Sequence, residues 1–188
     1  MQPVILASQS PRRKELLGRY GIPFEVVPSG ADESFASGSA QRRVAQLCRA
    51  KAQEVASRFP GRIVLAADTL VSAGGEILGK PKDTDDVRRM FSLLSGSVHE
   101  VWTGVCLITE NGELLADEAV TRVTFLPVDP DWLERYSRTA EPMDKAGAYA
   151  IQGRAGIWVE QVEGSESNVI GLPLNVVTRL FLKAGISF

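Results

Sequence analysis

The chain has 188 residues, 44% hydrophobic and 23% charged, so it can bury a core and is not mainly disordered. Its net charge of -2 gives no support for a protein that coats nucleic acid, because such proteins usually carry a basic excess. The 2 cysteines form no CxxC pair and there is 1 histidine, which disfavours disulfide scaffolds, Cys or His zinc sites and a Ser-His-Asp triad.

The spacing of apolar residues predicts alternating strands and helices. In chain order we expect a strand at 4–7, a helix at 11–20, a strand at 22–27, a helix at 39–59, a strand at 63–67, an extended segment at 69–72, a helix at 84–94, a hairpin of 99–109 with 113–125, a helix at 131–138, a strand at 157–162 and a helix at 173–183. The pattern favours one mixed α/β domain over residues 1–188, with two lobes around a cleft as the alternative.

Several local signals set the ends of these elements. Ser10 and Thr84 are expected to cap helices, and Asp68 to end its strand. Asn111-Gly112 is a strong two-residue hairpin turn. No leader and no apolar stretch of the ~20 residues needed to span a membrane is evident, so we expect a cytoplasmic protein without membrane contact.

The first candidate site lies where the first strand meets the first helix, in Ser8-Gln9-Ser10-Pro11-Arg12-Arg13. A helix N-terminus presents free N–H groups, and Arg12 and Arg13 add charge-assisted donors, so the segment suits phosphate binding. The alternative is a capped surface helix with solvated arginines.

Two lysines are further candidates for anion contacts. Lys51 falls on the apolar face of helix 39–59, where an amine must either reach solvent or meet an anion. Lys80 ends Gly74-Gly75-Glu76-Ile77-Leu78-Gly79-Lys80, which has P-loop spacing. Pro81 stands where a P-loop needs Ser or Thr, so we reject that fold. Lys80 remains either an anion contact or a solvated loop lysine.

Two acidic residues suggest a metal site. Asp68 follows a buried strand, and Glu33 lies in the loop Ala31-Asp32-Glu33. Together they could hold Mg²⁺, which takes carboxylate, water and phosphate oxygens. The alternatives are a strand-end turn residue for Asp68 and a solvated loop acid for Glu33.

The segment from Asp144 to Gly153 is rich in small residues, which allow close backbone approach. Asp144 and Lys145 could form a salt bridge, and Gln152 can both donate and accept, which suits contact with a base edge. A tight structural crossing is the alternative. His99 is interpreted as a surface or strand-end residue, and residues 165–168 as a loop.

Taken together, these motifs resemble the Maf family of nucleoside triphosphate pyrophosphatases. The resemblance runs from Val4 to Lys183. The motifs that carry it are Ala7-Ser8-Gln9-Ser10-Pro11-Arg12-Arg13, Ala66-Ala67-Asp68-Thr69, Gly79-Lys80-Pro81, Asp144-Lys145-Ala146-Gly147-Ala148-Tyr149, Ile151-Gln152-Gly153 and Val169-Ile170-Gly171-Leu172-Pro173. Each is weak alone, but together in this order they are specific.

The resemblance implies an α/β fold like that of inosine triphosphatases, a mixed twisted sheet with flanking helices and a deep cleft between two lobes, often in a dimer. It implies cleavage of a nucleoside triphosphate into a monophosphate and pyrophosphate with a divalent cation, Mg²⁺ or Mn²⁺. The roles it implies for individual residues are catalysis by Asp68, Glu33 and Lys80, metal binding by Glu33 and Asp68, and substrate binding by Ser8, Arg12, Arg13, Lys51, Thr69 and Gln152.

Arg12 and Thr69 match the branch of the family that acts on dTTP, UTP and modified pyrimidine triphosphates. The sister branch, which acts on 7-methyl-GTP, carries Trp and Gln at the two positions. That activity is one alternative. A regulator of cell division, or a nucleic-acid-binding protein that uses the basic cluster at residues 12–14, is another, which the net charge disfavours. We expect a nucleotide substrate and no stable binding to nucleic acid.

Overall fold

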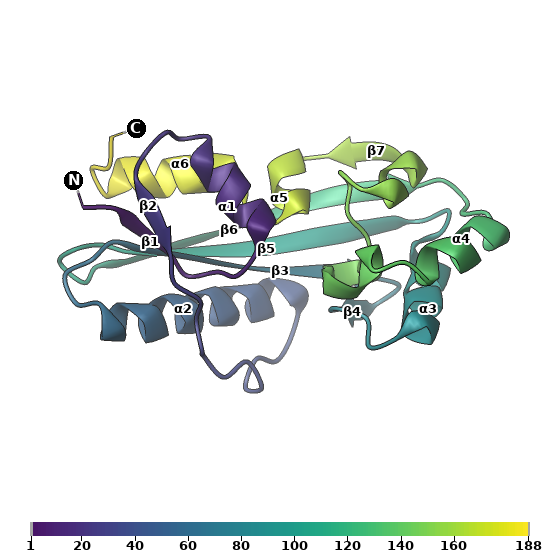
Figure 1. Cartoon of the computed structure of the whole chain (residues 1–188), viewed down its shortest axis with the longest axis horizontal. Helices are drawn as coiled ribbons and strands as arrows, with labels where there is room; N and C mark the ends of the chain where they lie inside the picture. The colour runs from purple at the N-terminus through teal and green to yellow at the C-terminus, as the bar shows by residue number, and fades with distance from the viewer. Residues whose placement is uncertain (1, 188) are drawn as a thin grey trace. The chain divides into compact units, whose positions relative to one another are not determined.

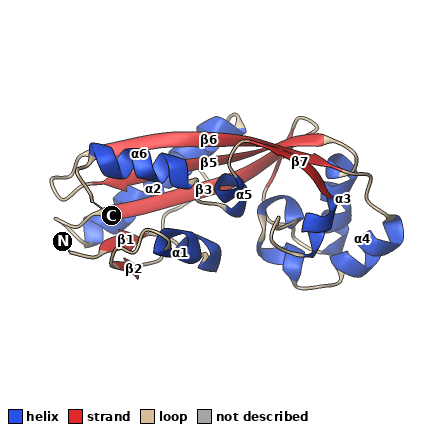
Figure 2. Ribbon diagram, turned by 90° about the horizontal axis from the view of Figure 1, so that it is seen from above, coloured by secondary structure: helices blue, strands red, loops and turns tan. Residues whose placement is uncertain are grey.

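The computed structural model describes residues 2–187, which divide into two compact units. The first unit holds the residues up to Asp68, Thr103–Ala119 and the residues from Gly171 onward; the second holds Thr69–Trp102 and Val120–Ile170. In this described part of the chain the strands form a seven-stranded sheet in the order β2-β1-β3-β5-β6-β7, with β4 paired to β3 (Figure 1). Parallel and antiparallel pairs both occur, and helices flank the strands, so the predicted α/β class is confirmed (Figure 2).

In the first unit the sequence predicted the elements closely. They are β1 (Val4–Leu6), α1 (Pro11–Gly18), β2 (Phe24–Val26), α2 (Ala40–Arg58), the start of β3 (Val64–Ala73) and α6 (Leu174–Lys183). Ser10 caps α1 by accepting a hydrogen bond from the N–H of Arg13, and Pro11 occupies the first helical position. Ser39 caps α2 in the same way.

The core of the first unit explains the position of α2. Its face of Cys48, Ala52 and Val55 packs on β1, β3 and β5 (Val98–Ile108). The helices α1 and α6 lie across the opposite side of these strands (Figure 1). The apolar spacing in the sequence predicted this face of α2, because i, i+3 and i+4 positions point the same way.

The second unit is built around aromatic side chains. Its elements are β4 (Glu76–Leu78), α3 (Thr84–Leu94), β6 (Leu114–Phe125), which begins in the first unit, α4 (Pro130–Ser137), β7 (Val159–Glu163), α5 (Glu166–Ile170) and the 3-10 turns Glu141–Asp144, Ala146–Ala148 and Arg154–Trp158. Phe91, Phe125, Tyr136 and Tyr149 are buried in its core. The predicted hairpin of β5 and β6 is present, and its turn, with Gly112 at φ 79, belongs to the first unit.

The expectation that Asp68 ends its strand is wrong. Asp68 lies inside β3, which continues to Ala73. The strand continues because Gly74-Gly75 reverses the chain into β4, which pairs with β3 at Val71↔Leu78 and Ala73↔Glu76. Asp68 is itself buried, and the partly buried positions of β3 begin only after it, at Thr69 and Leu70.

Of the two roles expected for His99, the strand-end position is present, but the surface role is wrong. It lies near the start of β5 and is 1% exposed, on the same face as Val101. Residues 165–168 do not form a plain loop: α5 begins at Glu166, and buried Asn168 donates to the carbonyl of Val101 and the hydroxyl of Thr121. The helix cap predicted at Thr84 falls one residue earlier, at Asp83.

Candidate functional site

Three of the predicted site residues meet in the first unit. The ammonium Nζ of Lys51 lies 2.5 Å from Oδ1 of Asp68 and 2.9 Å from Oε1 of Glu33. Lys51 comes from α2, Asp68 from β3 and Glu33 from the loop between β2 and α2. One cation therefore holds two carboxylates from different elements together.

This arrangement explains why an amine interrupts the apolar face of α2. The side chains of Lys51 and Asp68 are only 15% and 11% exposed, whereas that of Glu33 is 57% exposed. A charge buried to this degree needs an ionic partner, because its desolvation is otherwise costly. Of the two outcomes expected for Lys51, the structure shows the contact with an anion.

Ser8 and Arg13 form a second group of contacting site residues in the first unit. Arg13 donates from Nε to the carbonyl oxygen of Gly171 at 2.7 Å and from Nη1 to Oγ of Ser8 at 3.4 Å. The same Oγ accepts the backbone N–H of Ser10 at 3.1 Å. Burial lowers the pKa of Arg13, and the charges of Asp68 and Glu33 oppose that shift. An arginine remains protonated in this setting, so Arg13 contributes a fixed positive charge near the two carboxylates.

The carboxylates also fit the predicted metal chemistry. Asp68 and Glu33 converge on a single point, which the ammonium of Lys51 takes in this structure. Among residues 2–187, no group of three or more His, Cys, Asp or Glu side chains is arranged to hold a metal. Two carboxylates suit Mg²⁺, since this ion usually keeps several waters and takes further oxygens from substrate phosphates.

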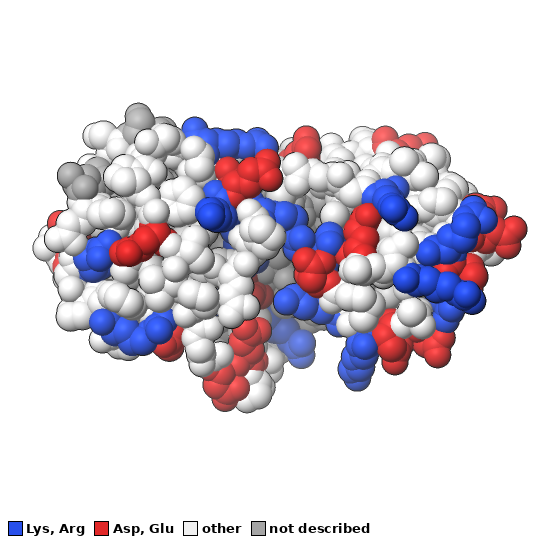
Figure 3. All heavy atoms as spheres, viewed as in Figure 1, with Lys and Arg blue, Asp and Glu red and all other residues white. Residues whose placement is uncertain are grey.

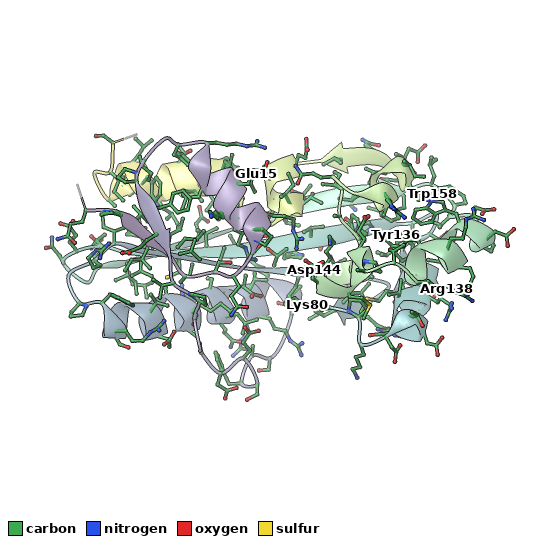
Figure 4. All side chains as sticks on the ribbon, in the orientation of Figure 1. Glu15, Lys80, Tyr136, Arg138, Asp144 and Trp158 are labelled. Atoms are coloured by element: carbon green, nitrogen blue, oxygen red, sulfur yellow. The ribbon has the colours of Figure 1, made fainter. Side chains whose placement is uncertain are left out.

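The other predicted residues belong to the second unit. Lys80 is exposed and follows Gly79, whose carbonyl accepts the N–H of Gly147 at 3.0 Å. This bond joins two of the sequence motifs, and Figure 4 labels Lys80 and Asp144 in this region. Gly147 has φ 70, and a Cβ there would lie 2.9 Å from Cγ2 of Val71. The tight crossing expected from the small residues is therefore present.

Gln152 is exposed in the turn that precedes the 3-10 segment Arg154–Trp158. The predicted ion pair between Asp144 and Lys145 is present, with Nζ 2.5 Å from Oδ1. Thr69 follows Asp68 in β3 and is half-buried, as is Arg12 in α1. The structure thus brings Glu33, Lys51 and Asp68 into direct contact, while a shared site that includes Arg12, Thr69, Lys80 and Gln152 remains a prediction.

Two residues that hold parts of the candidate site in place, Gly171 and Glu141, were not predicted from the sequence. The carbonyl of Gly171 fixes the guanidinium of Arg13, and the carboxylate of Glu141 accepts the backbone N–H of Arg154 at 2.8 Å. Gly171 lies in one of the family motifs, to which no role had been assigned, so that motif could have pointed to it. No motif or spacing pointed to Glu141, because its role comes from a contact with a backbone N–H thirteen residues away.

The surface charge is mixed. On the face in Figure 3, basic and acidic side chains are interspersed over both units. Ion pairs among the described residues, such as Arg88 with Glu134 and Arg89 with Glu76, also join side chains of opposite charge. None of the helices within residues 2–187 has the length and apolar character required to cross a membrane.

Comparison with known proteins agrees with the motifs. The family model described as Maf-like protein matches residues 3–184. The chain belongs to the Maf family. A Maf relative from Thermococcus gammatolerans, named dTTP/UTP pyrophosphatase, is 48% identical over 177 residues, which is 94% of each chain. A protein of the same name from Anaeromyxobacter dehalogenans is 48% identical over 187 residues, covering 97% of this chain and 94% of its own.

The fold extends beyond the family. The structure of the Staphylococcus aureus Ham1 protein covers 98% of this chain and 100% of its own, with a TM-score of 0.57 at 11% identity. At that identity the likeness shows a shared fold only. It agrees with the predicted α/β sheet flanked by helices.

Proposed function

We propose that this Maf protein hydrolyses nucleoside triphosphates to a monophosphate and pyrophosphate, with dTTP and UTP as its preferred canonical substrates. The observation that carries the proposal is the contact of Lys51 with Asp68 and Glu33, which lie close enough to Arg13 for their charges to act on it. The names of the relatives from Thermococcus and Anaeromyxobacter support both the reaction and the two substrates.

The role of Asp68 is to orient the attacking water and accept its proton. A positioned general base of this kind contributes typically 10²–10⁴-fold to the rate. Its place in the middle of β3 holds the carboxylate rigidly, because backbone on both sides is paired in the sheet. Lys51 keeps the carboxylate in position before substrate binds.

The cationic residues neutralise the triphosphate. A nucleoside triphosphate carries about four negative charges, so its cleavage depends mainly on positioning and electrostatic stabilisation. Arg13 is pre-oriented by Gly171 and Ser8, while Arg12 and Lys80 supply further positive charge. Thr69 and Gln152 are assigned to the nucleoside end of the substrate.

A divalent cation, Mg²⁺ or Mn²⁺, is part of the proposal. Glu33 and Asp68 would hold it, and it would supply charge neutralisation at the phosphate oxygens. The exposed side chain of Glu33 can reach such an ion from its loop, whereas Asp68 is fixed in the sheet.

Three further expectations belong to the proposal. The family resemblance supports action in the cytoplasm and allows a homodimer. It also supports a single Maf-like domain over residues 1–188, whose two units share the long strands β3, β5 and β6. Neither membrane association nor stable binding to nucleic acid is part of the proposed activity.

The test of the reaction is a matched pair of variants. Asp68→Asn keeps the shape of the side chain but removes the base, so pyrophosphate release from UTP should fall at least about 100-fold. Asp117→Asn is the control, because Asp117 pairs with Arg179 on the surface of the same unit. Turnover of Asp68→Asn within about threefold of the unmodified protein, with unchanged melting, contradicts the assignment.

A further inference from the structure

The carboxylate of Glu141 lies at the centre of a hydrogen-bond network in the second unit. Its Oε1 accepts the backbone N–H of Arg154 at 2.8 Å and lies 3.5 Å from the hydroxyl oxygen of Tyr136. The carbonyl oxygen of Glu141 accepts Nζ of Lys145 at 2.6 Å. Figure 4 labels Tyr136 and Asp144 in this part of the molecule. Glu141 therefore connects three segments through both its side chain and its backbone.

The carboxylate of Glu141 lies very close to the backbone of Gly153, in the turn that follows Gln152. A Cβ built on Gly153 would lie 2.1 Å from Oε1 and 2.8 Å from Cδ of Glu141. Gly153 has φ -100, which any residue can adopt, so the requirement for glycine is one of space and not of backbone conformation. The carboxylate rests directly on the backbone that follows Gln152.

The same hydrogen-bond network also includes the backbone of residues 148–150, which precede Gln152. Tyr136 donates to the carbonyl oxygen of Ala148 at 3.0 Å, and the N–H of Gly153 donates to that of Ala150 at 3.0 Å. Burial, with the charge of Glu141, raises the pKa of Tyr136, so its hydroxyl stays a donor at neutral pH. The backbone is thus fixed on both sides of Gln152.

Gln152 needs such support from its neighbours. Its side chain is exposed, so core packing does not set its direction. A side chain that reads a base edge gains selectivity only when it is held in one geometry, because a mobile amide can adapt to the wrong base. The N–H of Arg154 bonded to a carboxylate is a charge-assisted contact, stronger than a bond to a neutral acceptor.

We propose that Glu141 is a positioning residue for base discrimination, which holds the turn that presents Gln152 to the nucleobase. This inference rests on the proposed function, since it needs Gln152 to contact the base. It assigns no chemical step to Glu141. The carboxylate acts through the backbone of Gly153 and Arg154.

The measured quantity is the ratio of kcat/KM for UTP to that for GTP. Glu141→Ala should lower this ratio at least about tenfold, through a higher KM for UTP with kcat little changed, while GTP turnover stays the same. Glu141→Gln keeps an oxygen acceptor of the same shape, so its ratio should stay within about threefold of the unmodified protein. Glu163→Ala, an exposed carboxylate on β7, serves as the matched control.

Gly153 supplies a second, independent test. Gly153→Ala should lower the ratio, because the new Cβ displaces the carboxylate of Glu141. In a Glu141→Ala background the obstacle is gone, so the same change should add little further loss. Such non-additivity is expected for residues in direct contact, and simple additivity of the two effects contradicts the proposal. If Glu141→Ala does not fold, the proposal is still tested by the other two variants: it requires that Gly153→Ala lowers the ratio of kcat/KM and that Glu141→Gln does not.

Gln152→Ala separates this inference from the proposed function. If Gln152→Ala leaves the ratio unchanged, Gln152 does not read the base, and both assignments are overturned. If Gln152→Ala lowers the ratio and Glu141→Ala does not, only the role of Glu141 is overturned. Equal losses for UTP and GTP in Glu141→Ala would show a merely structural role and also overturn it.

Discussion

Acid should destabilise this protein through its single histidine. His99 is 1% exposed, and its ring packs edge-to-face on Phe125 and Tyr149 at centroid distances of 5.0 and 5.3 Å. Nε2 lies 2.7 Å from the hydroxyl of Tyr149, and Nδ1 has no hydrogen-bond partner among residues 2–187. Protonation would place an N–H on both ring nitrogens, so that of Nδ1 would be buried without an acceptor.

Burial lowers the pKa of His99 from 6.5 to about 4. The pKa of His99 is lower in the folded protein than in the unfolded chain. At a pH between these two values, His99 is protonated in the unfolded chain but neutral in the folded protein. The free energy of unfolding is therefore unaffected by His99 above pH 6.5 and falls as pH decreases toward 4. The full loss is about 3 kcal/mol, from 1.36 kcal/mol for each pH unit of the gap.

The assay is urea unfolding between pH 4.5 and 7.5, with His99→Gln beside the unmodified protein. Glutamine does not titrate and still offers a polar group to Tyr149, so the variant should lose stability less steeply below pH 6.5. Because His99 lies outside the proposed catalytic residues, the variant should also keep its pyrophosphatase activity. Identical slopes for the two proteins, or a pKa near 6.5 for His99 in a histidine NMR titration, would refute the reasoning.

Three other predictions follow from the site and its surroundings. Activity should require a divalent cation, since Glu33 and Asp68 converge as oxygen donors; full turnover in excess EDTA would show otherwise. Arg13→Ala and Lys80→Ala should each lower kcat/KM by about 10²–10³-fold through lost charge stabilisation, and wild-type kinetics for both would show that neither residue stabilises the triphosphate. Gly147→Ala should cost about 1–3 kcal/mol in urea unfolding, given φ 70 and the contact with Val71, and a neutral result would argue against the crossing.

Much of the fold was predictable because local signals agree with tertiary structure. Ser10 and Ser39 cap their helices, and the Asn111-Gly112 turn sets the hairpin, through interactions within a few residues. Lys51 was also identifiable, because a charged residue on an apolar helix face requires a partner. Which carboxylates would meet it depended on the tertiary fold, and its pairing with Asp68 and Glu33 was not predicted from the sequence.

The errors arise where long-range contacts decide the environment. His99 lies in an alternating strand whose buried face could not be identified without the aromatic partners Phe125 and Tyr149. Asn168 looks like a loop residue, but it folds into a short helix because its amide satisfies the carbonyl of Val101. Glu141 gave no signal because its partner is a backbone N–H in another turn.

The most direct test of the central claim is a comparison of kcat/KM for dTTP and UTP with those for ATP, GTP and 7-methyl-GTP, with Mg²⁺ present and pyrophosphate as the measured product. The account predicts that dTTP and UTP are cleaved to the monophosphate and pyrophosphate at least about tenfold more efficiently than each purine nucleotide. The reason is that a site built to hydrogen-bond the edge of one base leaves its own polar groups unpaired when a different base binds. A purine nucleotide that equals or exceeds both would contradict the specificity, and the absence of pyrophosphate from every nucleotide would contradict the reaction itself.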